Sequence, residues 1–256
     1  MIDFAVASDR ATPGLVRERV GEWCLRGGLG ATRRANSTTA HGDPGIGIEG
    51  AIDAVERFSA TQGVPATVQV WDETPPAVAA ELDRRGYTTG PTTEVMAGSR
   101  CTVFDRLRSP ALAVDVAAAP PETFARSLTA ERFREVTSTG LVSRFASASD
   151  ETVALSVGMA LLDPPLVGLF SLTTREPHRG QGAGSAVVRG LLDGLDGDGC
   201  DTVWLQVETV NTRALEWYAR LGFTTRTRYR YRTSPFTTTS SSVRSEDART
   251  ERDSMP

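Results

Sequence analysis

The sequence predicts an α/β (α+β) fold, in which the strands of a central sheet alternate with amphipathic helices. Residues 166–195 combine an apolar strand, a glycine-rich turn and a helix with an apolar stripe. Residues 201–223 combine an alternating strand with a second amphipathic helix. A hydrophobic content of 39% in 256 residues is enough for a substantial core, which agrees with this class.

The first 105 residues show the same alternation. Strands are expected at residues 22–26, 68–71 and 88–98, and helices at residues 49–62 and 76–86. The second of these helices ends in Arg85-Gly86-Tyr87, an ending similar to Leu221-Gly222-Phe223 later in the chain. We interpret this similarity of the two helix endings as an internal repeat, although a glycine at the end of a helix is common in any fold.

The rest of the chain divides into a second repeat and a tail. A first strand is expected at residues 112–116, helical segments from Pro120 to about residue 140, and a hairpin from strands 152–162 and 166–174. Residues 233–256 are rich in Ser, Thr and charged residues, which predicts a disordered tail. The predicted units are therefore residues 1–105, 106–232 and 233–256.

A row of arginines follows the second repeat's last helix. Arginine alternates with Thr and Tyr over residues 226–232, which predicts a strand with four guanidinium groups on one face. Tyr229 and Tyr231 would then lie on the other face. The arginine face is either a solvated surface or a wall that attracts an acidic substrate.

The glycine-rich turn predicts a phosphate site. Backbone N–H groups of residues 181–185 can point into one concavity at the start of a helix, whose partial positive charge favours an anion. A P-loop is excluded because the chain has no lysine, and neither reading of G-x-G-x-x-G places a glycine at its third position. An ordinary β–α turn remains the alternative. The turn's residues are Arg179, Gly180, Gln181, Gly182, Ala183, Gly184 and Ser185.

These motifs resemble those of the GNAT superfamily of acyl-CoA-dependent N-acyltransferases. The matching patterns are Arg179-x-x-Gly182-x-Gly184 and Asn211-x-x-Ala214-x-x-x-Tyr218-x-x-x-Gly222-Phe223, in the family's order and usual separation. The resemblance covers roughly residues 106–232. It implies a GNAT fold, with a mixed central sheet flanked by helices, and acetyl-CoA as co-substrate without a metal.

The resemblance also implies roles for particular residues. Residues 179–185 and Asn211 are expected to bind the cofactor. Strand 166–174 is expected to part from strand 201–208, so that the pantetheine arm pairs with backbone groups of Leu172 and Thr174. A backbone N–H of the same strand would stabilise the oxyanion. Tyr218 is the expected general acid, and its alternative role is a packed aromatic residue.

The general base is less defined by the pattern. In some GNAT members a glutamate occupies the strand position that here holds Gln206, and an amide cannot accept a proton at neutral pH. Glu208 lies two residues further on, on the same face of the strand. It can bind the amine, relay a proton through water or form a structural ion pair, and bulk water is a further candidate base.

A narrower likeness extends over most of residues 15–232. The run of residues 22–37, together with VQVW, LDRRGY and the closing RYRYR, resembles a bacterial tandem-GNAT family, some members of which are labelled N-acetylglutamate synthases. The first half lacks the Arg-x-x-Gly-x-Gly loop, so we do not expect it to bind CoA in the usual way. The polar segment at residues 34–37 either faces the cleft between the halves or caps a buried turn.

The expected activity is acetyl transfer from acetyl-CoA to a primary amine of a small molecule, with an amino acid first among the candidates. The alternatives are acetylation of a protein N-terminus or side chain, and a non-catalytic acyl-CoA sensor. A net charge of −4 argues against a nucleic-acid partner. Three unclustered cysteines, no apolar run of membrane length and no visible signal peptide predict a cytoplasmic protein, as a monomer or homodimer.

Overall fold

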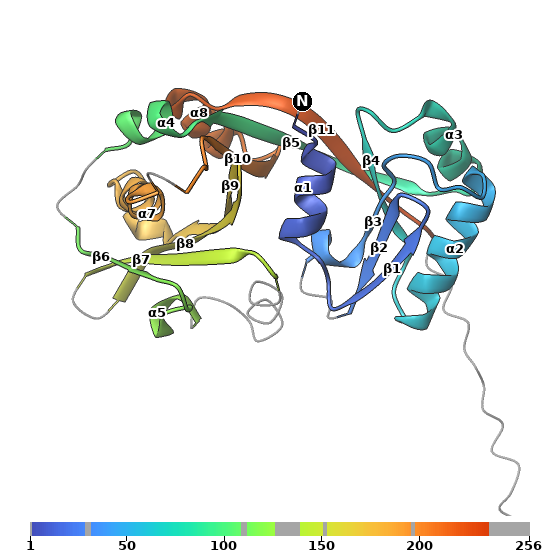
Figure 1. Cartoon of the computed structure of the whole chain (residues 1–256), viewed down its shortest axis with the longest axis horizontal. Helices are drawn as coiled ribbons and strands as arrows, with labels where there is room; N and C mark the ends of the chain where they lie inside the picture. Colours follow the sequence, from blue (N-terminus) through green and yellow to red (C-terminus); the bar gives the residue numbers. More distant parts are fainter. Residues whose placement is uncertain are drawn as a thin grey trace, which may run out of the picture.

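A single mixed sheet runs through the whole molecule (Figure 1). The computed structural model describes residues 2–28, 32–108, 112–125, 139–150, 153–195 and 198–235. The sheet has eleven strands in the order β1-β2-β3-β4-β11-β5-β10-β9-β8-β7-β6. The predicted mixed central sheet flanked by helices is confirmed.

Strands from the first 105 residues form one side of the sheet. They are β1 (Val16–Val20), β2 (Trp23–Gly27), β3 (Thr38–Thr39), β4 (Thr67–Trp71) and β5 (Thr88–Ser99). The helices of this region are α1 (Phe4–Ala11), α2 (Ile48–Thr61), α3 (Pro76–Arg84) and α4 (Arg100–Arg106), with the 3-10 turn η1 at Arg34–Asn36. The strands and helices predicted here are present, whereas α1, β1, β3 and α4 were not predicted.

The remaining strands are β6 (Val114–Ala117), β7 (Val142–Asp150), β8 (Val153–Asp163), β9 (Leu166–Thr174), β10 (Thr202–Glu208) and β11 (Thr224–Thr233). Helices α5 (Glu122–Ala125), α7 (Ala183–Leu192) and α8 (Thr212–Leu221) and the turn η2 (Glu176–His178) connect them. Most of the helical region predicted after Pro120, and the predicted tail beyond Pro235, lie outside the described residues.

The last strands of the two predicted repeats are exchanged. β5, from the first repeat, pairs with β10 along Ser99–Thr93, while β11 pairs with β4 on one side and β5 on the other. Figure 1 shows both as long strands that cross from one end of the molecule to the other. The sheet is therefore continuous across residue 105, and the division into units at that residue stays a prediction.

Helices cover both faces of the sheet, because alternate side chains of each strand face opposite sides. On β10, Val203 and Leu205 belong to a core packed against α7 and α8, whereas Trp204 belongs to a core packed against α1. A third core joins α2 and α3 to β2 and β4. The site described below lies where the first two cores meet.

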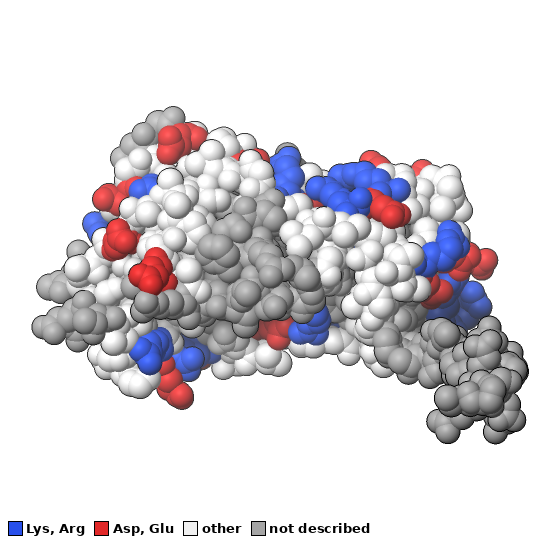
Figure 2. Space-filling model, turned by 90° about the horizontal axis from the view of Figure 1, so that it is seen from below, with Lys and Arg blue, Asp and Glu red and all other residues white. Residues whose placement is uncertain are grey.

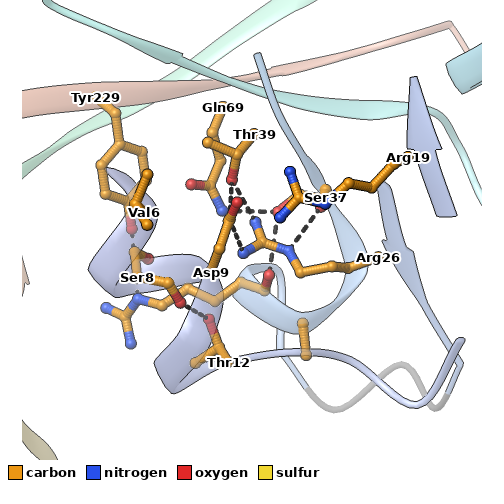
Figure 3. A network of polar contacts seen from close by, with 12 residues as sticks. Val6, Ser8, Asp9, Thr12, Arg19, Arg26, Ser37, Thr39, Gln69 and Tyr229 are labelled. Carbon is orange, nitrogen blue, oxygen red and sulfur yellow. Dashed lines mark hydrogen bonds and ion pairs between the residues drawn. The ribbon is translucent and has the colours of Figure 1, made fainter. Parts of the chain in front are cut away.

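Helix α1 is attached to the neighbouring strands β2 and β3 through a buried ion pair. Arg26 Nη1 lies 2.5 Å from Asp9 Oδ1, and the Arg26 side chain is fully buried. Thr39 Oγ1 accepts from Arg26 Nη2 at 2.8 Å and donates to Asp9 at 2.6 Å, while the carbonyl of Ser37 accepts from Arg26 Nε (Figure 3). All three nitrogens of the buried Arg26 guanidinium group thus have an acceptor, as burial of a charge requires.

Candidate acyl-transfer site

The site begins where two parallel strands part. β9 and β10 pair only over Leu166–Gly168 and Thr202–Trp204. Beyond these residues lies a cavity of about 380 Å³, lined by Arg34, Leu169, Phe170, Ser171, Leu172, Leu205, Gln206, Val207, Glu208, Val210, Asn211, Ala214 and Tyr218. The predicted parting of strands 166–174 and 201–208 is therefore present.

A bulge in β9 lies beside this opening. The register with β8 shifts between the pairs Val157–Thr173 and Met159–Phe170, which leaves an extra residue on β9. Ser171 has φ = 52°, in the left-handed region that residues with a side chain seldom adopt. Bulges of this kind redirect the backbone next to functional sites. Here the bulged residues Ser171 and Leu172 form part of the cavity wall.

Tyr218 reaches the cavity from α8. Asn211 begins this helix by accepting from the N–H of Ala214 at 3.2 Å, and Gly222, with φ = 97°, ends it. The Tyr218 ring packs between Trp217 and Phe223, and the residue is 8% exposed. Burial raises the pKa of its hydroxyl to about 12. Tyr218 lines the cavity, and its hydroxyl has no hydrogen-bond partner among the described residues.

The first repeat has a similar corner without the hydroxyl. Phe223 N donates to Tyr218 O at 3.1 Å, and Tyr87 N donates to Leu82 O at 3.0 Å, each across a left-handed glycine. Leu82 thus occupies in α3 the place that Tyr218 occupies in α8. A leucine has no proton to give, so this corner offers no acid.

Glu208 lies at the cavity end of β10 and is held by a residue of the first part. Its Oε1 is 2.7 Å from Arg33 Nη2, and the Glu208 side chain is 35% exposed. Arg33 also stacks over the Tyr231 ring, 4.9 Å from the ring centroid. This ion pair fixes the carboxylate at the cavity mouth while leaving it accessible to solvent.

Gln206 points to the same face of β10, and both ends of its amide are hydrogen-bonded. Its Nε2 donates to Ser8 Oγ of α1 at 2.8 Å, and its Oε1 accepts from Tyr229 Oη at 2.9 Å. Arg34 donates to Tyr229 Oη at 3.3 Å and to the Gln206 carbonyl at 3.5 Å. Ser8 and Arg33 were missed by the sequence reasoning, because no local pattern shows that they meet β10.

The segment at residues 34–37 satisfies both interpretations offered by the sequence. Arg34 lines the cavity, whereas Asn36 and Ser37 stabilise the turn itself. Asn36 Nδ2 donates to Thr32 O at 2.8 Å, and Ser37 Oγ donates to Arg34 O at 3.2 Å. The turn thus presents one arginine to the cavity on a backbone held by its neighbours.

The glycine-rich loop lies at the start of α7 and does not line this cavity. Gly182, with φ = 95°, precedes the helix, and its carbonyl accepts the first helical bond, from Ala186 N at 2.9 Å. Within the described residues, no protein acceptor pairs with the N–H groups of residues 181–185. Four amides at a helix start typically lack an internal partner, which makes them available to an anion.

The other predicted loop residues hold this turn together. Arg179 Nε donates to Thr174 O at 3.2 Å, and Gln181 Nε2 donates to Pro177 O at 2.9 Å. A Cβ on Gly184 would lie 3.2 Å from Thr174 Oγ1, so the glycine lets α7 approach the end of β9 closely. The predicted residues thus form two groups, with Leu172, Glu208, Asn211 and Tyr218 at the cavity and Thr174 and residues 179–185 at the loop.

The arginines of β11 are not part of the site. Arg226, Arg228 and Arg230 are exposed as predicted, but Arg232 is buried and bonds to Asp83 and to the Tyr87 carbonyl, so the expectation of four solvated guanidinium groups is wrong there. The packing of α3 and the following turn against this end of β11 explains the difference. Basic and acidic groups lie side by side on the face shown in Figure 2.

Neither a metal centre nor a membrane-spanning helix is found in the described ranges. No group of three or more His, Cys, Asp or Glu side chains there is arranged to hold a metal ion. No helix there combines the length and the apolar character needed to cross a membrane.

Comparison with known protein families shows which family this chain belongs to. Residues 3–232 match the family described as "Probable histone acetyltransferase Rv0428c C-terminal". The chain belongs to this acetyltransferase family. It is an N-acetyltransferase of the GNAT type, a class that uses acetyl-CoA as its co-substrate.

Similar proteins agree with this assignment. The uncharacterized N-acetyltransferase YobR of Bacillus subtilis is 23% identical over 231 residues, covering 86% of this chain and 93% of that protein. The ribosomal protein bS18-alanine N-acetyltransferase of Escherichia coli K12 is 33% identical over 70 residues, which cover 27% of this chain and 46% of that protein.

Solved structures share the fold. A GCN5-related N-acetyltransferase from Kribbella flavida has a TM-score of 0.69 at 15% identity, covering 91% of this chain and 95% of that chain. A tandem GNAT protein from the clavulanic acid biosynthesis pathway has a TM-score of 0.59 at 15% identity, covering 73% of this chain and 69% of that chain. The N-acetylglutamate synthase label stays a prediction.

Proposed function

We propose that this GNAT-type enzyme acetylates the primary amine of a small molecule, with amino acids as the first acceptors to test. The observation that carries the proposal is the cavity between β9 and β10, whose lining includes both Tyr218 and Glu208. Its volume of about 380 Å³ suits the end of an acyl-pantetheine arm together with a small acceptor.

The residues present fit acetyl-CoA. The N–H groups of residues 181–185 and the start of α7 would hold its pyrophosphate, and Arg179 would add a positive charge beside them. The parted strands would receive the pantetheine arm, with Leu172 and Thr174 of β9 as its backbone partners and Asn211 beside it. When bound, the cofactor supplies an acyl group activated as a thioester.

Tyr218 would act as the general acid. Its hydroxyl remains protonated at neutral pH because burial raises its pKa to about 12. A proton held there at the cavity is in place for transfer to a leaving thiolate.

Glu208 would receive the amine. As a carboxylate it favours an ammonium group at the cavity mouth, and its partial exposure allows a water molecule to carry the proton away. Gln206 would have a positioning role, because both ends of its amide are already bonded to Ser8 and Tyr229.

A second candidate is acetylation of a protein. The family description names a probable histone acetyltransferase, and the 33% identical segment belongs to an enzyme named for the alanine of a ribosomal protein. Such an acceptor would need its N-terminus or side chain to enter the same cavity.

Thiol release from acetyl-CoA tests the proposal. Purified protein is incubated with acetyl-CoA and a panel of amino acids, other small amines and peptides with free N-termini, and both the free thiol and the acetylated product are measured. Turnover with small amines supports the proposal, and turnover with peptides alone supports the second candidate. A protein that binds acetyl-CoA tightly and turns over no amine would contradict both and match the sensor alternative.

A further inference from the structure

Glu208 lines the cavity with only one of its carboxylate oxygens engaged. Its Oε1 pairs with Arg33 Nη2 at 2.7 Å, and no hydrogen bond joins its Oε2 to any residue that the structure describes. Among the described residues that line the cavity, Glu208 is also the only carboxylate. The second oxygen is therefore available to accept from an ammonium group at the cavity mouth.

Arg33 comes from the first repeat and is enclosed by three adjacent strands. Its guanidinium carbon lies 4.9 Å from the centroid of the Tyr231 ring, which is buried in β11. Its Nη1 lies 3.4 Å from the place that a Cβ on Gly90 of β5 would occupy, so this glycine leaves room for the guanidinium group. Glu208 of β10 is the third neighbour. These contacts fix the direction from which Arg33 meets the carboxylate.

The turn that carries Arg33 is itself anchored. Asn36 N donates to the Arg33 carbonyl at 3.2 Å, within the 3-10 turn η1. Ser37, the next residue, accepts from Gln69 Nε2 at 2.8 Å and, through its carbonyl, from Arg26 Nε at 3.1 Å. Figure 3 shows Ser37 within this buried network. A cation on a fixed turn loses little freedom when it forms an ion pair, so the pair can hold one geometry.

Stability of the fold does not explain this arrangement. The Arg33 side chain is 50% exposed and the Glu208 side chain 35% exposed, and ion pairs with this much exposure contribute little to folding. Gly90 has no left-handed φ, so its backbone does not require a glycine, whereas the space taken by Arg33 does. The contacts around Arg33 therefore favour a role in placing the Glu208 carboxylate.

We propose that Arg33 is a positioning residue for acetyl transfer, which holds Glu208 Oε1 so that Oε2 binds the ammonium group of the acceptor. This inference rests on the proposed function. Arg33 acts only through Glu208 and does not touch the acceptor. The first repeat thereby takes part in acceptor binding, although it lacks both the glycine-rich loop and an equivalent of the Tyr218 hydroxyl.

A double-mutant cycle tests whether Arg33 acts through Glu208. We measure kcat and KM for the small amine that the wild type turns over with the highest kcat/KM, in the wild type, Arg33→Gln, Glu208→Gln and the double variant. Arg33→Lys is added because it keeps the charge. The dissociation constant of the amine from the CoA-bound protein, measured by isothermal titration calorimetry, is a second readout that needs no turnover.

Arg10→Gln is the matched control. Arg10 pairs with Asp163 at 2.7 Å and its side chain is 50% exposed, the same values as for Arg33. Neither residue of this pair lines the cavity. The control therefore measures the loss of an exposed ion pair away from the site. Melting temperatures and the affinity for CoA check the fold and the cofactor site of every variant.

We expect Arg33→Gln to lower kcat/KM for the amine, and to weaken its binding, by about 5- to 20-fold, because the carboxylate is no longer held at the cavity mouth. Arg33→Lys should stay within about 3-fold of the wild type because it keeps the ion pair. Arg10→Gln should match the wild type. In the Glu208→Gln background, removing Arg33 should change either value by less than about 2-fold. Affinity for CoA should stay constant.

Three results would overturn the inference. The first is an effect of Arg33→Gln no larger than that of Arg10→Gln. The second is an equal loss from Arg33→Gln with and without Glu208, which would show that Arg33 acts independently of the carboxylate. The third is a Glu208→Gln variant that binds and turns over the amine like the wild type.

If Arg33→Gln lowers the melting temperature, Arg33→Met takes its place in the same cycle, because methionine keeps an unbranched side chain over the Tyr231 ring. Failure of the proposed function is distinct from all of these results. The wild type would then release no thiol from acetyl-CoA with any small amine.

Discussion

Tyr218 and Leu82 occupy matching places in two similar corners, but only Tyr218 carries a hydroxyl. Both lie one turn before a left-handed glycine and accept the same backbone bond from the residue after it. At the residue scale, the proposed acid chemistry therefore depends on the single Tyr218 hydroxyl. The scaffold around it is repeated in the molecule, but the hydroxyl is not.

Replacing Tyr218 by Phe tests its role as the acid. We expect kcat to fall by about 100-fold or more, because the variant has no proton to give, while KM for acetyl-CoA changes by less than about 3-fold. The melting temperature should change little, since the hydroxyl bonds to no described residue. Equal losses in kcat and in cofactor affinity would make Tyr218 a packing residue.

The pKa of Glu81 predicts an effect on acid stability. Hydrogen bonds from Arg84 and Arg85 lower it from 4.5 to about 2. The folded state therefore gains stability above pH 4.5, and this gain is lost as the pH falls toward 2. Melting temperatures measured over this range should fall less steeply for Glu81→Gln than for the wild type. Glu216→Gln, which removes an exposed ion pair, should not change the slope.

At the scale of elements, the site is formed by two strands that stop pairing and two helices that begin beside them. The bulge at Ser171 changes the path of β9, α7 begins at a left-handed glycine, and α8 begins at Asn211. Each of these is a local backbone feature. Together they leave a cavity between β9 and β10 and unpaired backbone N–H groups at the start of α7, within the described residues.

Gly184→Val tests the loop. A side chain at Gly184 would meet Thr174 and crowd the amides at the start of α7, so KM for acetyl-CoA should rise by about 10-fold with a smaller change in kcat. Gly50→Val is the matched control, because Gly50 lies in the first turn of α2 with only ordinary contacts to Ile46. Comparable increases in KM for both variants would argue against pyrophosphate binding at this loop.

Helix α1 depends on the Asp9–Arg26 ion pair. Asp9→Asn leaves a fully buried guanidinium group without its counter-charge, which should cost about 3 kcal/mol of unfolding free energy. Asp3→Asn, at the exposed start of the same helix, should cost less than about 1 kcal/mol because asparagine also caps a helix. Urea unfolding followed by circular dichroism measures both, and similar costs for the two would show that the pair adds little.

At the scale of the whole molecule, exchange of β5 and β11 joins the two predicted repeats into one sheet. β10 has β5 as its neighbour on one side, and β11 lies between β4 and β5. Neither repeat has a complete sheet without the other, and Arg33 and Arg34 bring the first repeat to the cavity.

We therefore expect one cooperative unfolding transition for the intact chain. Fragments 1–105 and 106–232, expressed separately, should lack cooperative unfolding, because each leaves long strand edges unpaired. Calorimetry and circular dichroism of the fragments measure this. Two independent transitions, at temperatures that the separate fragments reproduce, would show that the repeats fold as autonomous domains.

The sequence by itself determined the elements and the motifs. Alternation and helical spacing located most strands and helices, and the loop at residues 179–185 and Tyr218 were recognised because phosphate binding and helix ends leave short-range patterns. These features depend on residues close together in the chain. The alternation of arginines over residues 226–232 could not show that Arg232 is buried. The helix α3 and the turn after it reach the C-terminal end of β11 only in the folded state.

Only the tertiary structure decided which residues share the cavity. The contacts of Arg33 with Glu208, Arg34 with Gln206, and Ser8 with Gln206 join positions more than 170 residues apart. They arise because β5 and β11 exchange places in the sheet and bring α1 and η1 beside β10. Pairing between strands that are distant in the chain depends on the burial of whole sheet faces. A short stretch of sequence does not contain the residues that form such a face.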